Sequence, residues 1–526
     1  MSRTKATDFS PRIRTALVAA ITLLILIIPL WPEFDAPGLA MDEGTVLLYP
    51  ELVLKGWVPY RDFETFYGPL NLWTLAGAYS VFGAHIFVER AVGLAYHLAI
   101  LLGVFFLGRR AGLVVAAGSA LCAGFLLRLA HLQALAWLGG VACAIWSILL
   151  LAEAGRWRVF FGGLLSAAAL LYRPDLGPAV ILATAPLLWR LPAELRWRWV
   201  AGFAAGLVPL GVLTLVAGPL NVINNLFIYP VLHCNAGRRL PLWDATHWIQ
   251  TLVFLHVGAS ISAFLAGAIA WKRQPQSAAG PLLLSAGFLA IGFTHQALQR
   301  VDSIHVVFAA FLSVALLPAA VHFLSTRGAG GEARFVPGFA CVATALAILM
   351  TAAFPVVGSY AGEFCASFVD SKIGSIFLRQ SGRQFPFASP SQAVQAGKVV
   401  SLLDAEATPG QRLFVGPGDL RRAYSNDTYL YHLAPQLVPA SYFLEMNPLS
   451  ANRPDSRLAA DVATADWLVL NRFWDRWKED NASSQLGPDG PNEIVRSHFI
   501  LHRKIGEFDV YRRKTAGVPR VATATH

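Results

Sequence analysis

The stretch Met41–Tyr67, MDEGTVLLYPELVLKGWVPYRDFETFY, decides how the rest of the chain is organised. It follows one hydrophobic segment, Thr15–Trp31, and precedes a long region of mostly apolar sequence. It begins with two adjacent carboxylates, Asp42 and Glu43, and we expect it to be a polar loop beside the membrane. In one interpretation these acids only cap a short helix in a solvated loop. In the other they are presented to a substrate.

The composition is that of a membrane protein. Of 526 residues, 55% are hydrophobic and only 14% are charged, and the mean hydropathy is +0.51. Soluble domains carry roughly 25% charged residues. The formal net charge of +10 comes from basic residues scattered into short loops between apolar segments, which excludes a nucleic-acid partner. We therefore predict a polytopic α-helical membrane protein with room for one soluble domain.

Apolar runs of about 20 residues mark the membrane-spanning helices. The sequence predicts eleven of them, of which the fifth and sixth are short: residues 15–32, 87–107, 111–127, 132–152, 159–172, 177–190, 199–217, 248–270, 280–297, 304–323 and 335–355. The apolar stretch 68–83 begins with Gly-Pro, and we expect it to be a helix lying at the interface.

The basic residues of the loops predict the orientation. With the N-terminus in the cytoplasm as a retained signal anchor, fifteen lysines and arginines fall inside and eight fall in short outside segments. An odd number of spans then places the C-terminal region outside the cytoplasm, on the same side as Asp42. The predicted parts are a transmembrane domain, 1–357, with a first external loop, 33–86, and an extracytoplasmic domain, 358–526.

The C-terminal region changes in composition, since charged residues, proline and asparagine become frequent after Gly358. Three segments have the pattern of strands: Arg412–Val415, Asp466–Leu470 and Glu507–Tyr511. A fourth segment, Pro390–Asp404, has the apolar spacing of a helix. We therefore predict a small α/β domain.

Three outer loops each pair an arginine with an acid: Arg61 with Asp62, Arg173 with Asp175, and Arg300 with Asp302, followed by His305. Such groups near a membrane core are costly and tend to be functional. Each also has a structural interpretation, as a pair that ends a helix, an interaction that fixes a loop, or a buried histidine. Arg238 and Arg239 form either a lipid-headgroup patch or a solvated turn.

Several motifs carry a family resemblance: Asp42-Glu43-Gly44, the run Gly56–Phe63 (GWVPYRDF), Tyr67-Gly-Pro-Leu70, and a helix ending at Phe82-Gly83. Together they resemble the GT-C glycosyltransferases, closest to the bacterial protein O-mannosyltransferase and aminoarabinose-transferase type. The resemblance implies a multi-span enzyme of the inner membrane that uses polyprenyl-phosphate sugars. In that family an acid of the first external loop is the catalytic base or orients the acceptor, and Asp42 stands at its position. Beyond residue 90 only the general layout is similar.

The expected reaction is transfer of a sugar, with inversion, from a polyprenyl-phosphate donor to a lipid, glycan or protein acceptor. A carboxylate takes the acceptor proton, and arginine suits the donor phosphate. We expect Asp42 to be the base, Glu43 to orient the acceptor or bind a divalent metal ion, and Arg173 and Arg300 to bind phosphate, with His305 as a further donor.

Two other classes of function remain open at this point. A transporter or lipid flippase would show two similar halves and a polar site at the midplane, and the sequence shows no such halves. A membrane scaffold would only display the outer domain. In that domain Val415–Asp419 and Pro439–Pro448 (PASYFLEMNP) resemble external domains of GT-C enzymes, which indicates acceptor binding or a lid. Of the five cysteines, Cys234 and Cys365 fall outside the spans and could form a disulfide.

Overall fold

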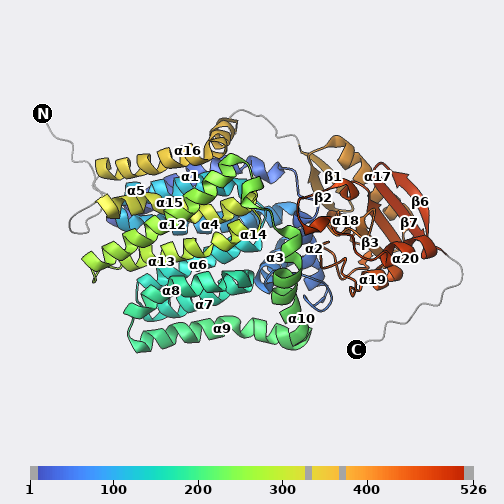
Figure 1. Cartoon of the computed structure of the whole chain (residues 1–526), viewed down its shortest axis with the longest axis horizontal. Coiled ribbons are helices and arrows are strands. Elements are labelled where there is room, and N and C mark those ends of the chain that lie inside the picture. Colours follow the sequence, from blue (N-terminus) through green and yellow to red (C-terminus); the bar gives the residue numbers. More distant parts are fainter. Residues whose placement is uncertain (1–9, 326–334, 367–374, 515–526) are drawn as a thin grey trace.

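A computed structural model describes residues 10–325, 335–366 and 375–514. Figure 1 shows a bundle of long helices running side by side along the long axis, with an α/β domain beyond one end. All eleven predicted spans coincide with helices: α1 (Pro11–Ile27), α4 (Ile86–Gly108), α5 (Leu113–Leu127), α6 (Ala136–Ala152), α7 (Arg156–Tyr172), α8 (Gly177–Arg190), α9 (Ala193–Ala217), α12 (His247–Arg273), α13 (Ala279–Gly292), α15 (Ser303–Ser325) and α16 (Phe335–Ala366).

Eight of these helices, some together with an adjoining turn, are long and apolar enough to cross a membrane. The other three are shorter, with 17 residues in α6, 17 in α7 and 14 in α8. Exposed tryptophans lie near both ends of the bundle, as membrane–water interfaces favour: Trp157, Trp189 and Trp197 at one end, Trp31 and Trp243 at the other. The chain is thus a polytopic membrane protein, as predicted.

The first half of the stretch that was expected to be a polar loop, Met41–Tyr67, is a buried helix, α2 (Asp42–Leu54). Its first turn contains Asp42 and Glu43, which suit the positive end of the helix dipole. Most of the other residues of α2 are apolar and buried, because the helix is covered by α3 (Pro69–Phe82) and by the C-terminal domain. The expectation of a loop was wrong because many partners of these apolar side chains belong to the C-terminal domain, hundreds of residues away. The helix α3 lies where an interfacial helix was predicted, beside α2 at the end of the bundle (Figure 1).

Short helices complete the end of the bundle that faces the C-terminal domain. They are α10 (Pro219–Ile223), the π-helix η6 (Asn224–His233), α11 (Cys234–Arg238), α14 (Thr294–Gln299) and the 3-10 turn η5 (Pro174–Leu176). The cysteine expected to form a disulfide here, Cys234, is buried with a free thiol, and Cys365 in α16 is also free.

The C-terminal domain is built on a five-stranded sheet of order β4-β3-β5-β7-β6. The strands β3, β4 and β5 are parallel, whereas β7 runs antiparallel to both β5 and β6. Three of these strands match the predicted ones. The elements are the hairpin β1 (Ile376–Gln380) and β2 (Arg383–Phe387), then α17 (Pro390–Glu406), β3 (Arg412–Pro417), α18 (Tyr429–Leu433), β4 (Val438–Pro439), α19 (Leu458–Thr464), β5 (Trp467–Asn471), α20 (Gly490–His498), β6 (Phe499–Ile505) and β7 (Phe508–Arg513).

The helix α2 and the C-terminal domain share one hydrophobic core. Leu47 and Leu52 of α2 pack in the same cluster as Phe385, Leu403 and Trp467 of the domain. An ion pair joins the two parts as well, since Glu51 accepts hydrogen bonds from both terminal nitrogens of Arg383 at 2.9 and 2.7 Å. The domain is therefore packed onto the membrane part through α2, in addition to being linked to it by the chain.

A glycine of α2 packs closely against the C-terminal domain, and this contact yields a stability prediction. A Cβ atom added to Gly44 would lie 2.5 Å from the backbone nitrogen of Tyr429, so Gly44→Ala forces α2 and α18 apart. Overpacking of this kind costs about 1–3 kcal/mol, and we expect a lower midpoint of thermal unfolding in detergent. The control is Gly77→Ala in α3, where the added Cβ meets nothing within 4 Å and helix propensity improves by up to about 1 kcal/mol. Equal stability of the two variants would contradict the close packing.

Candidate functional site

The two adjacent acids of α2 lie in opposite environments. Glu43 is fully buried, and its carboxylate accepts two hydrogen bonds from Arg90 of α4, at 2.8 and 3.0 Å. The remaining terminal nitrogen of Arg90 donates to the carbonyls of Glu33, Phe34 and Ala36 at 2.8–3.1 Å. Glu43 thus belongs to a closed network that anchors the start of α2 to the bundle.

Asp42 by contrast is exposed, and among the described residues its carboxylate has no hydrogen-bond or ion-pair partner. Protein nevertheless surrounds it, and this loss of hydration raises the pKa of Asp42 above its usual value. Arg238, His305 and Arg300 oppose the rise in pKa through their positive charge. Asp42 is therefore an unengaged carboxylate beside a group of cations.

These cations line a cavity of about 530 Å³ at the end of the bundle that faces the C-terminal domain. The wall combines polar side chains with apolar ones from η6 and α14, among which Val231 and Leu298 are exposed. The charged and histidine residues of the wall are Arg173, Asp175, Arg238, Arg239, His295, Arg300 and His305. The loops after α7, η6 and α14 thus meet here, although they are far apart in sequence.

Arg173 is held in a fixed orientation on one side of the cavity. It donates to both oxygens of Asp175 at 2.9 and 2.6 Å, and its guanidinium lies 5.4 Å from the ring centres of both Tyr67 and Trp137. Asp175 also contacts His295 at 3.1 Å. The neighbouring Arg173 and His295 lower the pKa of Asp175 despite its burial, so this acid is ionised.

Arg300 and His305 share Asp302 on the opposite side. Arg300 donates to one oxygen of Asp302 at 2.8 Å, and His305 contacts the other at 2.8 Å through Nδ1. Although burial opposes ionisation, these partners lower the pKa of Asp302 to about 2. Arg300 also binds Glu479 of the C-terminal domain.

Two further arginines of the cavity differ in their partners. Arg238 donates to the buried carboxylate of Glu445 at 3.2 Å, and burial raises the pKa of Glu445. Arg239 is exposed, and within the described part of the chain no hydrogen bond or ion pair engages its guanidinium. Arg238 and Arg239 were predicted to form either a headgroup patch or a solvated turn. Among the residues that the structure describes, Arg238 is engaged by a carboxylate and Arg239 is not.

Sequence reasoning missed four residues around the cavity: Glu445, Glu479, His295 and Tyr67. The only signal for Glu445 is that it is a lone acid in the apolar run PASYFLEMNP. For Glu479, which stands in an ordinary charged segment, the sequence offers no signal.

The predicted pair Arg61 and Asp62 lies apart from this cavity. The two side chains bind each other at 2.9 Å on the surface, and Asp62 accepts a hydrogen bond from the backbone of Val58 at 2.7 Å. Neither residue lines the cavity.

A divalent metal ion at Glu43 does not fit this arrangement. Both carboxylate oxygens of Glu43 are engaged by Arg90. In residues 10–325, 335–366 and 375–514, no three histidine, cysteine, aspartate or glutamate side chains are grouped as a metal site requires.

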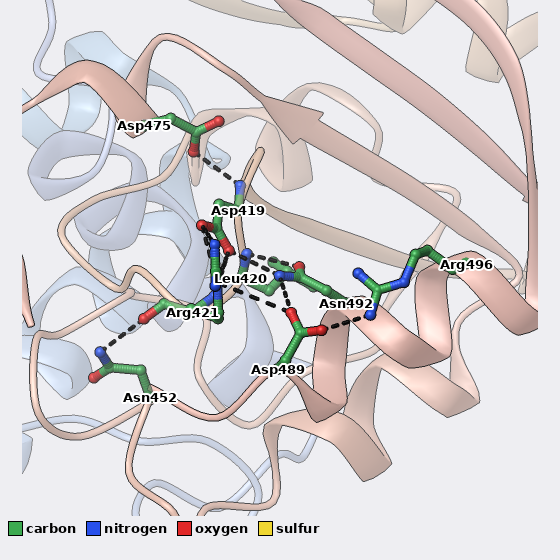
Figure 2. Close-up of polar contacts among 8 residues, drawn as sticks. All are labelled: Asp419, Leu420, Arg421, Asn452, Asp475, Asp489, Asn492 and Arg496. Atoms are coloured by element: carbon green, nitrogen blue, oxygen red, sulfur yellow. Dashed lines mark hydrogen bonds and ion pairs between the residues drawn. The ribbon is translucent and has the colours of Figure 1, made fainter. Parts of the chain in front are cut away.

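The turn after β3, predicted from Val415–Asp419, forms a closed polar network in the C-terminal domain (Figure 2). Asp419 pairs with Arg421 at 2.8 Å, and Asp475 accepts from the backbone nitrogen of Asp419 at 2.8 Å. Asn492 donates to Asp419 and Asp489 at 2.8 and 3.0 Å. The three acids of this network are thus all engaged by side chains or backbone of the same domain, which is the arrangement of a structural turn.

No protein-family model matches the chain, and no curated protein matches it. Solved structures do match, among them ArnT from Cupriavidus metallidurans bound to undecaprenyl phosphate. That structure shares 14% sequence identity at a TM-score of 0.53, covering 97% of this chain and 100% of that one. The structure of ArnT in the apo state has 15% sequence identity and a TM-score of 0.48, and the match covers 95% of this chain and 98% of that one. Arabinosyltransferase EmbB from Mycobacterium smegmatis has 15% sequence identity and a TM-score of 0.37, and the match covers 70% of this chain and 41% of that one. The first likeness, over nearly the whole length of both chains, shows that this chain has the fold of ArnT. The GT-C-like fold implied by the sequence resemblance is thereby confirmed.

The geometry of Glu43 predicts a structural defect when it is changed. Glu43→Gln removes the negative charge that balances buried Arg90, and breaking a buried pair costs roughly 3–5 kcal/mol. We expect a markedly lower thermal midpoint and less inserted protein, measured in detergent and in membranes. The control is Glu194→Gln in the first turn of α9, where the acid is exposed. A Glu43→Gln protein of normal stability would show that the ion pair does not anchor α2.

Proposed function

We propose that the chain is an inverting glycosyltransferase that moves a sugar from a polyprenyl-phosphate carrier to a lipid, glycan or protein acceptor. The observation that carries this proposal is the unengaged carboxylate of Asp42, on which Arg238, Arg300 and His305 of the cavity wall act electrostatically. A base and an anion-binding surface at one site are what this reaction requires.

The donor end of the reaction needs a cationic surface next to the lipid. A leaving lipid phosphate carries negative charge, and the planar guanidinium of arginine binds phosphate oxygens with two parallel hydrogen bonds. Arg173, Arg238, Arg239 and Arg300 all line the cavity, whose apolar wall includes exposed Val231 and Leu298. The ArnT structure of the same fold is bound to undecaprenyl phosphate, which supports a lipid phosphate as the donor carrier.

The acceptor end needs a base. As the acceptor hydroxyl attacks the anomeric carbon, its proton passes to a carboxylate, and the lipid phosphate leaves with the electron pair of the broken bond. One carboxylate is sufficient for this inverting step. Asp42 is the candidate because its oxygens are unengaged, whereas those of Glu43, Asp175 and Asp302 are bound.

The loop charges support a site on the extracytoplasmic side. Loops rich in arginine lie at the end of the bundle away from the cavity, as the positive-inside rule requires of a cytoplasmic face. Among them Arg109, Arg110 and Arg158 line a separate cavity with Glu153. We therefore propose that the N-terminus is cytoplasmic and that the C-terminal domain lies outside the cytoplasm.

The role of Asp42 as base is tested by Asp42→Asn. We expect sugar transfer to fall by roughly 10²–10⁴-fold, since general-base help of that size is lost. The assay uses membranes with matched protein levels and labelled polyprenyl-phosphate sugars. The control is Asp62→Asn, an acid near the same helix whose carboxylate is already bound by Arg61 and the backbone of Val58, and it is expected to retain transfer. Normal transfer by Asp42→Asn would exclude Asp42 as the base.

The pH dependence of transfer tests the electrostatics of the site. Asp42 acts as a base only when ionised, so transfer rises with pH through the pKa of Asp42, which is raised by burial. The positive charge of His305 lowers that pKa. We expect His305→Gln to raise it further and to move the acid limb of the pH–rate profile to higher pH. An acid limb that stays in place, or moves to lower pH, would contradict the assignment.

A further inference from the structure

Each of the three side-chain nitrogens of Arg300 already donates to a protein acceptor in this structure. Its Nε donates to Asp302 at 2.8 Å, and its two terminal nitrogens donate to the two oxygens of Glu479 at 2.9 and 2.5 Å. One of them also donates to the carbonyl of Arg238 at 3.1 Å. Glu479 thus occupies the fork of Arg300 with the two-pronged geometry that a phosphate would adopt.

Glu479 is presented by a segment of the C-terminal domain. It lies between the 3-10 turns η8 (Trp474–Arg476) and η9 (Ala482–Ser484), and η9 packs against α11. The hydroxyl of Tyr424 and the amide of Asn481 donate to the Glu479 carboxylate at 2.7 and 2.9 Å. A prepared set of donors therefore holds the carboxylate at the cavity.

Asp175 and Asp302 are bound differently from Glu479. Asp175 is two residues from its arginine and is also held by His295, and Asp302 is two residues from Arg300 and held by His305. Each pair belongs to one loop. Glu479 is 179 residues from Arg300 in sequence and reaches it from another domain. Its removal therefore requires no rearrangement of the loops after α7 and α14. Glu445 also reaches a cavity arginine, Arg238, from this domain, but it is fully buried, whereas Glu479 is partly exposed.

We propose that Glu479 is a resident anion on Arg300 that the phosphate of a polyprenyl-phosphate ligand displaces. This inference rests on the proposed function, because it assigns Arg300 to the lipid phosphate. A carboxylate and a phosphate cannot share the same fork, since both need the same two donors and repel each other. Phosphate binding then releases the segment 474–484 from the cavity, which couples donor occupancy to the position of part of the C-terminal domain.

The experiment compares the affinity of the full-length wild type, Glu479→Gln and Asp480→Asn for undecaprenyl phosphate in detergent. A contact that blocks nine molecules in ten weakens apparent affinity by about tenfold. We therefore expect Glu479→Gln to bind roughly tenfold more tightly than wild type. Asp480→Asn removes the same charge from the neighbouring exposed residue and is expected to bind like wild type.

A second measurement on the unmodified chain covers the case in which Glu479→Gln does not fold. Hydrogen exchange in peptides spanning 474–484 is expected to become faster when undecaprenyl phosphate is added. Binding by Glu479→Gln that is equal to or weaker than that of wild type, or unchanged or slower exchange in this segment, overturns the inference while the proposed function stands. A wild type that binds no undecaprenyl phosphate overturns both.

Discussion

The buried ion pair between Glu43 and Arg90 is the interaction on which the arrangement of this molecule depends. Arg90 belongs to a membrane helix and also binds the three carbonyls that precede α2. A guanidinium in such a place is tolerated only when its charge and its hydrogen bonds are all satisfied. Glu43 satisfies the charge, and the first turn of α2 is consequently fixed to the bundle. Since Asp42 is the preceding residue, the pair also fixes the carboxylate that we assign as the base.

Charge compensation governs the cavity in the same way. Arg173, Arg238 and Arg300 each have a carboxylate partner within 3.2 Å. Without such partners the repulsion between arginines gathered in one cavity would oppose folding. The compensation leaves two groups without hydrogen-bond or ion-pair partners among the described residues, Asp42 and Arg239. In the proposed reaction, one unengaged acid and one unengaged cation, among cations already held in place, pre-organise the site for a donor that carries a phosphate and an acceptor that loses a proton.

Hydropathy predicted the spans because the cost of exposing polar backbone to lipid permits few alternatives to a long apolar helix. The loop pairs Arg173/Asp175 and Arg300/Asp302 were also visible, since their partners are two residues apart. The different environments of Asp42 and Glu43 were not. Adjacent residues on a helix point about 100° apart, so Glu43 faces the bundle and Asp42 does not, and the side that each faces depends on Arg90 in another helix. The contact of Arg300 with Glu479 was equally hidden, because only the tertiary fold brings a C-terminal segment to this loop.

The shared core of α2 and the C-terminal domain gives that domain a part in the chemistry. One end of α2 is held by Arg90, and its apolar face is packed among Phe385, Leu403 and Trp467. A rigid helix held at two places transmits a displacement of either. A shift of the domain therefore alters the position of Asp42, and a shift of the segment carrying Glu479 alters the charge around Arg300. In the proposed assignment, base and donor cation thus both depend on the C-terminal domain, although that domain contributes no base of its own. Asp419, at the turn after β3, and Asp475 are bound within one polar network of the domain. In the proposed function, the contacts of the domain with the membrane part are therefore the route by which it acts on transfer.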